Sequence, residues 1–212
     1  MTLAAGQKDL IVLAADPSMK VAIEDVLRRH HALGIRAVSA DVISHPLRDP
    51  GVLRDGHNFL RAQRGNYGYA LAVCDRHGCG NEALSRERLE SSIEQGLFVQ
   101  WADRAAAIVI DPELETWVWT DSPHVAHAVG WSGDMSSLRA WLRTGGLLAE
   151  GSVKPADPKA ALEALLRFTK RRKSSALFEA LAREVSLQGC ICPAFRKMTA
   201  TLQCWFPAAG DS

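Results

Sequence analysis

Carboxylates are the side chains that hold divalent cations and serve as general acids and bases, and here they follow apolar runs. Three such runs end at an acid or at an acid-rich turn. The runs are residues 10–15, followed by Asp16; residues 71–74, followed by Asp75 and then His77; and residues 105–110, followed by Asp111, Glu113 and Glu115.

The apolar runs predict buried strands, and parallel strands end at a common edge where α/β proteins bind ligands. We therefore expect Asp16 and Asp75 to lie on one edge of a sheet, with Glu113 or Glu115 nearby. Each acid also has a structural interpretation. Asp16 and Asp75 could cap helices or form turns, and the two glutamates could complement the dipole of a helix that begins there.

The composition is that of a soluble globular protein. The chain has 212 residues, with 25 Lys and Arg against 24 Asp and Glu, so no general nucleic-acid-binding field is expected. We expect neither a membrane span nor a signal peptide. The five cysteines do not form a disulfide framework, which favours the reducing cytoplasm.

One basic run stands out within this balanced composition. Lys170, Arg171, Arg172 and Lys173 follow each other between two expected helices. They could contact the phosphates of a nucleic acid. They could equally complement the carboxyl end of a helix dipole.

The first part of the chain alternates strands and helices, and the later part is helical. This pattern predicts an α/β fold, a central mainly parallel sheet flanked by helices, in residues 1–122. Residues 123–212 are expected to form a helical extension packed on that domain. The expected strands are 9–15, 35–43, 69–75 and 104–110; the expected helices are 18–32, 52–63, 82–100, 113–119, 124–131, 135–143, 157–170, 174–185 and 193–202.

The order of these motifs resembles the TOPRIM-like proteins related to the nuclease half of OLD-family ATPases, especially their small stand-alone relatives. The segments that carry the resemblance are 16–20, 75–77, 112–118 and 192–195. It implies a TOPRIM- or Rossmann-like fold and a nuclease that cleaves phosphodiesters with Mg²⁺ or Mn²⁺. Asp75, His77 and Glu115 would be catalytic, and Asp16, Asp75, Glu113 and Glu115 would hold the metal.

The resemblance further implies a component of a bacterial antiviral defence system, with nucleic acid or other proteins of that system as partners. Three residues depart from the family pattern. His77 replaces the second acid of Asp-x-Asp, Lys20 replaces a glutamate, and Pro17 replaces a glycine. Imidazole favours Mn²⁺ or Zn²⁺ over Mg²⁺, and a lysine near the site would repel a cation.

Several alternatives therefore stay open. The chain could be a catalytically degenerate TOPRIM-like subunit or sensor that acts through protein partners. It could also be a small-molecule or nucleotide-binding module, although no Walker A or Gly-x-Gly-x-x-Gly motif is present. A zinc site from His77, Cys79, Cys190 and Cys192 is a further alternative, with a spacing that fits no standard zinc motif.

Overall fold

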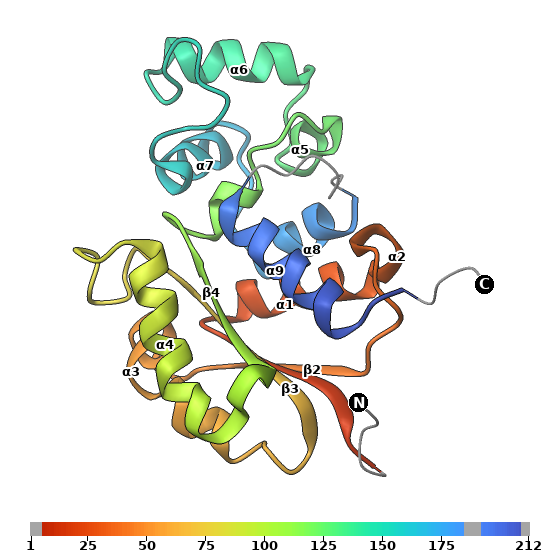
Figure 1. Cartoon of the computed structure of the whole chain (residues 1–212). Helices are drawn as coiled ribbons and strands as arrows, with labels where there is room; N and C mark the ends of the chain where they lie inside the picture. The colour runs from red at the N-terminus through yellow and green to blue at the C-terminus, as the bar shows by residue number, and fades with distance from the viewer. Residues whose placement is uncertain (1–5, 185–191, 209–212) are drawn as a thin grey trace.

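The computed structural model describes residues 6–184 and 192–208, and its centre is a parallel sheet (Figure 1). Four strands lie in the order β2-β1-β3-β4, and all neighbours are parallel. The predicted α/β class is confirmed. The strands are β1 (Lys8–Ala14), β2 (Ala40–Ser44), β3 (Tyr67–Asp75) and β4 (Ala105–Ile110).

Burial on both faces explains why three of the strands read as continuous apolar runs. In β1 every residue from Asp9 to Ala14 is buried, and β3 and β4 are buried over most of their lengths. Parallel sheets covered by helices on both sides require such runs. The strand β2 lies at an edge and only Val42 is fully buried, so its sequence is more polar.

Helices cover both faces of the sheet (Figure 1). On one face α3 packs on β1 and β3, and α4 packs on β4. On the other face α1 contacts β1 and β2, and α9 contacts β4. The helices that follow the strands are α1 (Pro17–Arg28), α2 (His30–Leu33), α3 (Arg48–Arg61), α4 (Arg86–Trp101) and the 3₁₀ turn η1 (Ala102–Arg104).

Helices dominate the chain after β4, as the sequence predicted. The helix α8 packs along α1, where Arg183 pairs with the buried carboxylate of Asp25 at 3.3 Å. The division between residues 122 and 123 stays a prediction. The later elements are η2 (Leu114–Trp117), α5 (Pro123–Ala128), α6 (Met135–Thr144), α7 (Pro158–Phe168), α8 (Ser175–Glu184) and α9 (Pro193–Trp205).

Side chains of α4 accept hydrogen bonds from backbone N–H groups on the outer edge of β4, where no further strand pairs with it among the described residues. The backbone N–H of Val109 donates to Glu90 and that of Ala107 donates to Glu94, both at 3.0 Å. Lys197 of α9 bridges the two glutamates, at 3.1 Å from Glu90 and 2.7 Å from Glu94. The edge N–H groups are thus hydrogen-bonded without another strand.

Several predicted elements differ from the structure. The helix predicted over residues 18–32 is divided into α1 and α2, and α3 and α4 begin at Arg48 and Arg86 rather than at residues 52 and 82. The second strand begins at Ala40 rather than at residue 35, because Ile35 and Arg36 pair with Pro207 and Phe206 near the end of the chain. The helix predicted over residues 113–119 is only the 3₁₀ turn η2. The glutamates at its start are held by lysines from later in the chain, as described below.

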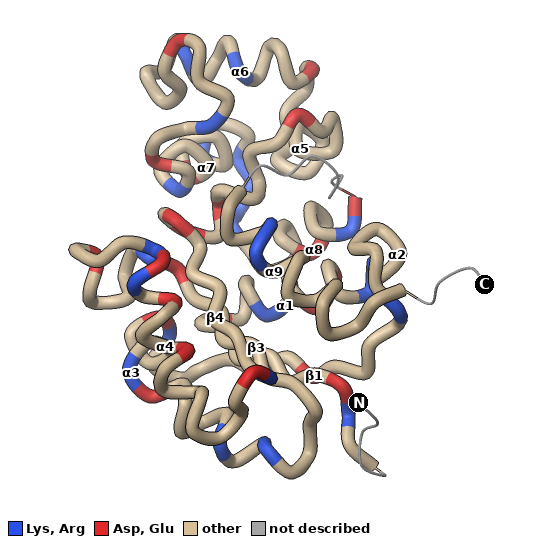
Figure 2. The backbone as a smooth tube through the Cα atoms, viewed as in Figure 1, with Lys and Arg blue, Asp and Glu red and all other residues tan. Residues whose placement is uncertain are grey.

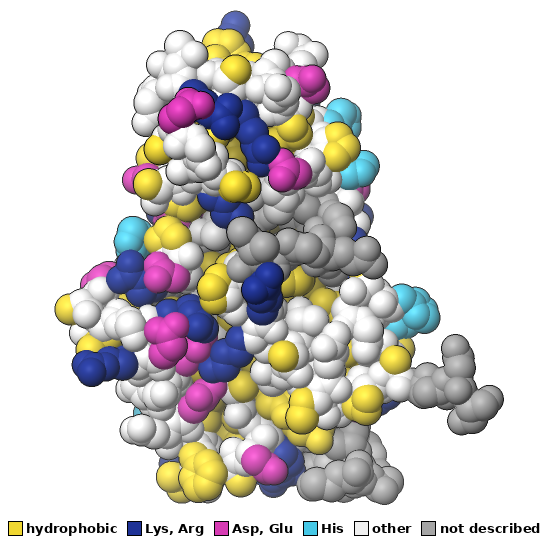
Figure 3. Space-filling view, turned by 45° about the horizontal axis from the view of Figure 1, so that its top comes forward, with side chains coloured by type: hydrophobic (Ala, Val, Ile, Leu, Met, Phe, Trp, Pro, Cys, Tyr) yellow, Lys and Arg dark blue, Asp and Glu magenta, His cyan; other side chains and the backbone are white. Residues whose placement is uncertain are grey.

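Acidic and basic residues are interspersed along the described backbone (Figure 2). On the face drawn in Figure 3, Lys and Arg side chains lie among Asp and Glu side chains, so this face has no broad basic surface. No helix within the described ranges has the length and apolar character required to cross a bilayer.

Candidate functional site

The strand order places a topological switch point between β1 and β3. The chain moves outward from β1 to β2, then returns past β1 to β3 and continues to β4. Ligands of open α/β sheets bind at the carboxyl ends of the strands at such a point. Ala14 of β1 pairs with Val73 of β3. Asp16 and Asp75 each lie two residues further along, so both acids are at the same level of this edge.

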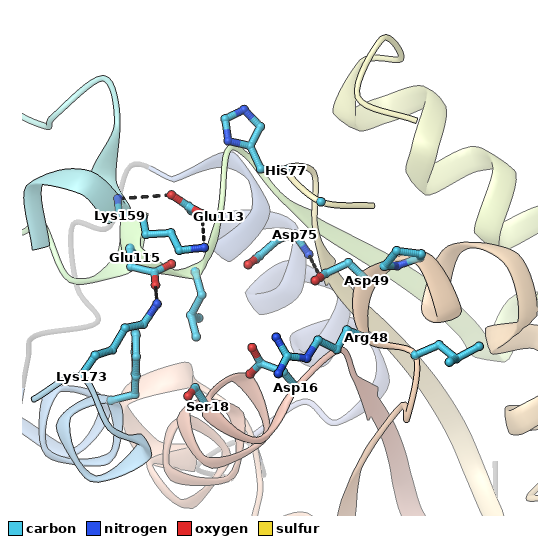
Figure 4. Close-up of a pocket in the computed structure, with 15 residues that line it drawn as sticks. Asp16, Ser18, Arg48, Asp49, Asp75, His77, Glu113, Glu115, Lys159 and Lys173 are labelled. Atoms are coloured by element: carbon cyan, nitrogen blue, oxygen red, sulfur yellow. Dashed lines mark hydrogen bonds and ion pairs between the residues drawn. The ribbon is translucent and has the colours of Figure 1, made fainter. Parts of the chain in front are cut away.

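A cavity of about 410 Å³ lies at this edge, and acids from all four strand ends line it (Figure 4). This is the size of a site for a small ligand. The predicted convergence of Asp16, Asp75 and the two glutamates on one edge is confirmed. The charged residues of its lining are Asp16, Asp49, Asp75, Glu113 and Glu115, with Arg48, Lys159 and Lys173.

Asp75 is the central acid. Its Oδ1 is shielded from solvent and has no hydrogen-bond partner among the described residues. Burial raises the pKa of Asp75 well above its usual value, and the nearby carboxylates of Asp49, Glu115 and Asp16 raise it further. A hydrogen bond with the backbone of Leu114 opposes this rise only in part. Asp75 therefore carries its negative charge at a cost unless a cation joins it.

Asp49, in the first turn of α3, is a site residue that the sequence analysis did not identify. Its Oδ1 accepts a 2.7 Å hydrogen bond from the backbone N–H of Asp75. Burial raises the pKa of Asp49, and the charge of Asp16 adds to the rise. No apolar run precedes Asp49. The only sequence signal was an acid in a Pro-rich loop between a strand and a helix.

Asp16 caps a helix and also lines the cavity. Its Oδ1 accepts a 2.9 Å hydrogen bond from the backbone N–H of Met19 and caps α1. The same side chain lines the cavity. Lys20, one turn into α1, lies 3.8 Å from Glu24 and does not line the cavity. Lys20 would therefore not contact a cation bound in the cavity, and its repulsion of such a cation stays a prediction.

The two glutamates after β4 face lysines of the helical extension (Figure 4). Glu115 forms an ion pair with Lys173. Glu113 accepts a 3.2 Å hydrogen bond from the backbone N–H of Lys159, and its Oε2 lies 3.8 Å from the Lys159 ammonium. Burial raises the pKa of Glu113, and the charge of Glu115 adds to it. Both glutamates reach the cavity, but each already has a cationic partner.

His77 is exposed at the rim, and its ring points away from Asp75 (Figure 4). It does not stand where a ligand shared with Asp75 would stand. The structure thus gives no geometric support to the expected catalytic role of His77 or to the expected preference for Mn²⁺ that depended on it.

The basic run does not form one patch. Lys173 lines the cavity, whereas Arg171 lies against Gly130, where an added Cβ would come within 2.9 Å of its Nε. Lys170 and Arg172 are exposed and do not line the cavity. A contact of all four residues with nucleic acid stays a prediction.

The carboxylate oxygens of the cavity suit a hard divalent cation, provided that a bound small molecule supplies the remaining oxygen ligands of that cation. Five carboxylates and three cationic side chains leave a formal charge of −2, which one divalent cation would neutralise. Across the described ranges, no three His, Cys, Asp or Glu side chains stand close enough to hold a metal ion by themselves. Mg²⁺ is commonly held by one or two carboxylates together with water and substrate phosphate, so it does not require such a group.

Three of the four residues of the zinc alternative, His77, Cys79 and Cys192, lie within the described ranges. Cys190 lies outside the described residues. Cys79 and Cys192 line two separate cavities, neither of which includes His77.

Comparisons of this chain with protein-family models, with curated proteins and with solved structures find no match. The functional assignment therefore depends on the geometry of the cavity and on the motifs in the sequence.

Proposed function

We propose that the cavity is a phosphoester-hydrolysing site of TOPRIM type, which takes a divalent cation, Mg²⁺ or Mn²⁺, together with a phosphate group of a nucleic acid. The observation that carries the proposal is the unpartnered, buried Oδ1 of Asp75 in a cavity lined by carboxylates from the other three strand ends. Such a cluster is stabilised when a cation neutralises it.

Asp75 would be the principal ligand, with Asp16 or Asp49 as the second carboxylate and phosphate oxygens completing the shell. The bound cation would activate water and neutralise charge on the phosphate. Glu113 and Glu115 would hold Lys159 and Lys173 in place rather than bind the cation. This assignment differs from the ligand set that the family resemblance implied.

Titration of Mn²⁺ into the full chain, followed by the loss of the electron paramagnetic resonance signal of free Mn²⁺, tests the cation site without relying on activity. We expect Asp75→Asn to weaken binding by about tenfold or more, as for loss of a charged ligand. Asp103→Asn is the matched control, because Asp103 is exposed in η1 at the opposite edge of the sheet. Equal Mn²⁺ binding by the two variants would contradict the proposal.

The hydrolytic part requires a separate assay. Single- and double-stranded DNA and RNA are incubated with the parent and with Asp75→Ala in Mg²⁺ and in Mn²⁺. We expect cleavage that depends on a divalent cation and is lost in Asp75→Ala. Cleavage that survives this substitution would come from another site or from a contaminant.

One observation favours a second candidate, the catalytically degenerate subunit or sensor. Lys159 and Lys173 already neutralise two of the cavity acids, as they would in a site that no longer takes a cation. The family resemblance adds that such a subunit would work with protein partners in an antiviral defence system. Absence of both Mn²⁺ binding and cleavage would select this candidate over the enzyme.

A further inference from the structure

The cavity has two chemically different walls (Figure 4). One wall, at the strand ends, is mainly acidic and carries Asp16, Asp49 and Asp75, together with the cationic side chain of Arg48. On the other side Lys159 and Lys173 approach from the helical extension, each beside a glutamate that pairs with it. A ligand that binds a cation on one wall and contacts ammonium groups on the other must itself be an anion.

The two ammonium groups are held in place but retain free donors. Lys173 donates to Glu115 and lies 5.9 Å from the ring centroid of Phe178, and its Nζ makes no further hydrogen bond to the described residues. The Nζ of Lys159 lies 3.8 Å from Glu113, which is too long for a hydrogen bond. An ammonium has three donors, so each lysine can still bind an oxygen anion.

The size of the cavity limits what can carry that anion. A volume of about 410 Å³ suits a ligand of the size of one nucleotide. Leu47 lines the cavity and is 63% exposed, so it offers an apolar surface for the body of such a ligand.

We propose that the cavity binds a terminal phosphate monoester of nucleotide size, with the phosphate between Lys159, Lys173 and the cation. This inference rests on the proposed function, because the cation on Asp75 is one of the phosphate partners. The phosphate in turn supplies the ligands that the protein lacks. Cation and phosphate should therefore bind together, each raising the affinity of the other.

Calorimetric titration of the full chain with adenosine monophosphate, with and without Mn²⁺, is the test. We expect binding in Mn²⁺, no binding of adenosine, and a loss of about tenfold or more for Lys173→Gln. Lys170→Gln is the matched control, since Lys170 belongs to the same basic run and lies outside the cavity. Equal affinity of parent and Lys173→Gln, or equal binding of adenosine, would overturn the inference.

A second variant is needed because Lys173→Gln could weaken binding by destabilising the fold. Lys173→Gln leaves Glu115 without its partner, although Glu115 is buried. The Lys159 side chain is 50% exposed and its ion pair is long, so Lys159→Gln should keep its fold and still weaken adenosine monophosphate binding. Unchanged affinity in Lys159→Gln, with an unchanged melting temperature, would also contradict the inference.

The outcomes separate the two proposals. Mn²⁺ binding without any effect of adenosine monophosphate overturns the phosphate site and leaves the cation site standing. Adenosine monophosphate binding that is independent of Mn²⁺ supports the lysine contacts but overturns the inferred coupling of phosphate and cation, and the Mn²⁺ titration by itself then decides whether the cation site exists. The phosphate could belong to a free mononucleotide or to the end of a nucleic acid, and a 5′-phosphorylated trinucleotide distinguishes these two sources, with the unphosphorylated trinucleotide as its control. Only a site for nucleic-acid ends would bind the phosphorylated trinucleotide as tightly as the mononucleotide.

Discussion

The backbone N–H of Asp75 donates a 2.7 Å hydrogen bond to the Asp49 carboxylate. Asp49 follows β2 in the chain, yet its helix α3 crosses behind β1 and brings it to the end of β3. The central acid of the cavity is thus positioned by an acid from two strands away. This bond joins the loop after β2 to the switch point of the sheet.

Removing that bond should affect stability and cation binding together. We expect Asp49→Ala to lower the free energy of unfolding by about 1.5–3 kcal/mol, as for a hydrogen bond to a charged group. Asp49→Asn keeps an acceptor oxygen for the Asp75 N–H and should stay within about 1 kcal/mol of the parent. Urea denaturation of both variants measures the difference. Equal losses in the two would mean that the bond itself contributes little.

Replacing the central acid should stabilise the protein without cation. Burial and neighbouring acids raise the pKa of Asp75, so its ionised form destabilises the native state. We expect Asp75→Asn to raise the free energy of unfolding by about 0.5–2 kcal/mol near neutral pH. Each kcal/mol should raise the melting temperature by about 2–4 °C. Thermal unfolding in a chelator provides the measurement.

The sign of the pH dependence follows from the same pKa. The native state holds the proton of Asp75 to a higher pH than the unfolded chain does, so its contribution to stability falls as pH rises above the unfolded value. The advantage of Asp75→Asn should therefore be larger at pH 8 than at pH 4. An advantage that is the same at both values would contradict the raised pKa.

A further prediction concerns the contribution of Glu90, at the edge of β4, to the stability of the fold, and it is independent of the cavity. Glu90 is buried and accepts hydrogen bonds from the Val109 N–H and from Arg86, and Lys197 also contacts it. We expect Glu90→Ala to cost about 3–5 kcal/mol, because it leaves buried partners uncompensated. Glu87→Ala is the control, since the Glu87 side chain is 67% exposed and should cost less than about 0.5 kcal/mol. Similar costs for both would refute the role of Glu90.

Asp9, at the amino end of β1, should make stability sensitive to acid. Hydrogen bonds from Arg36 and Ser39 lower its pKa from 3.8 to about 2. A lowered pKa means that the contribution is complete above the unfolded value and is lost as pH falls from about 4 towards 2. Asp9→Asn should cost about 1–2 kcal/mol at pH 7 and almost nothing near pH 2. Urea denaturation across this range is the measurement, and a constant cost would contradict it.

Three of the four strands and the two acids at the switch point could be predicted from the sequence alone, whereas the start of β2 could not. Residues 10–14, 70–74 and 106–110 are apolar because both faces of a parallel sheet are covered, and this makes them recognisable without a structure. Asp16 and Asp75 follow such runs directly. Their common edge follows from the parallel direction of the strands.

Only the tertiary structure decided which other groups complete the cavity. Asp49 does not directly follow an apolar run, because β2 is an edge strand with a more polar sequence, and its place depends on how α3 crosses the sheet. From the sequence, Glu113 and Glu115 were expected as metal ligands or first-turn acids, and Lys173 as a contact to phosphates or to the carboxyl end of a helix. Folding pairs Glu115 with Lys173 across 58 positions of the chain. Such pairing depends on how the helices pack, so it cannot be predicted from local patterns of residues.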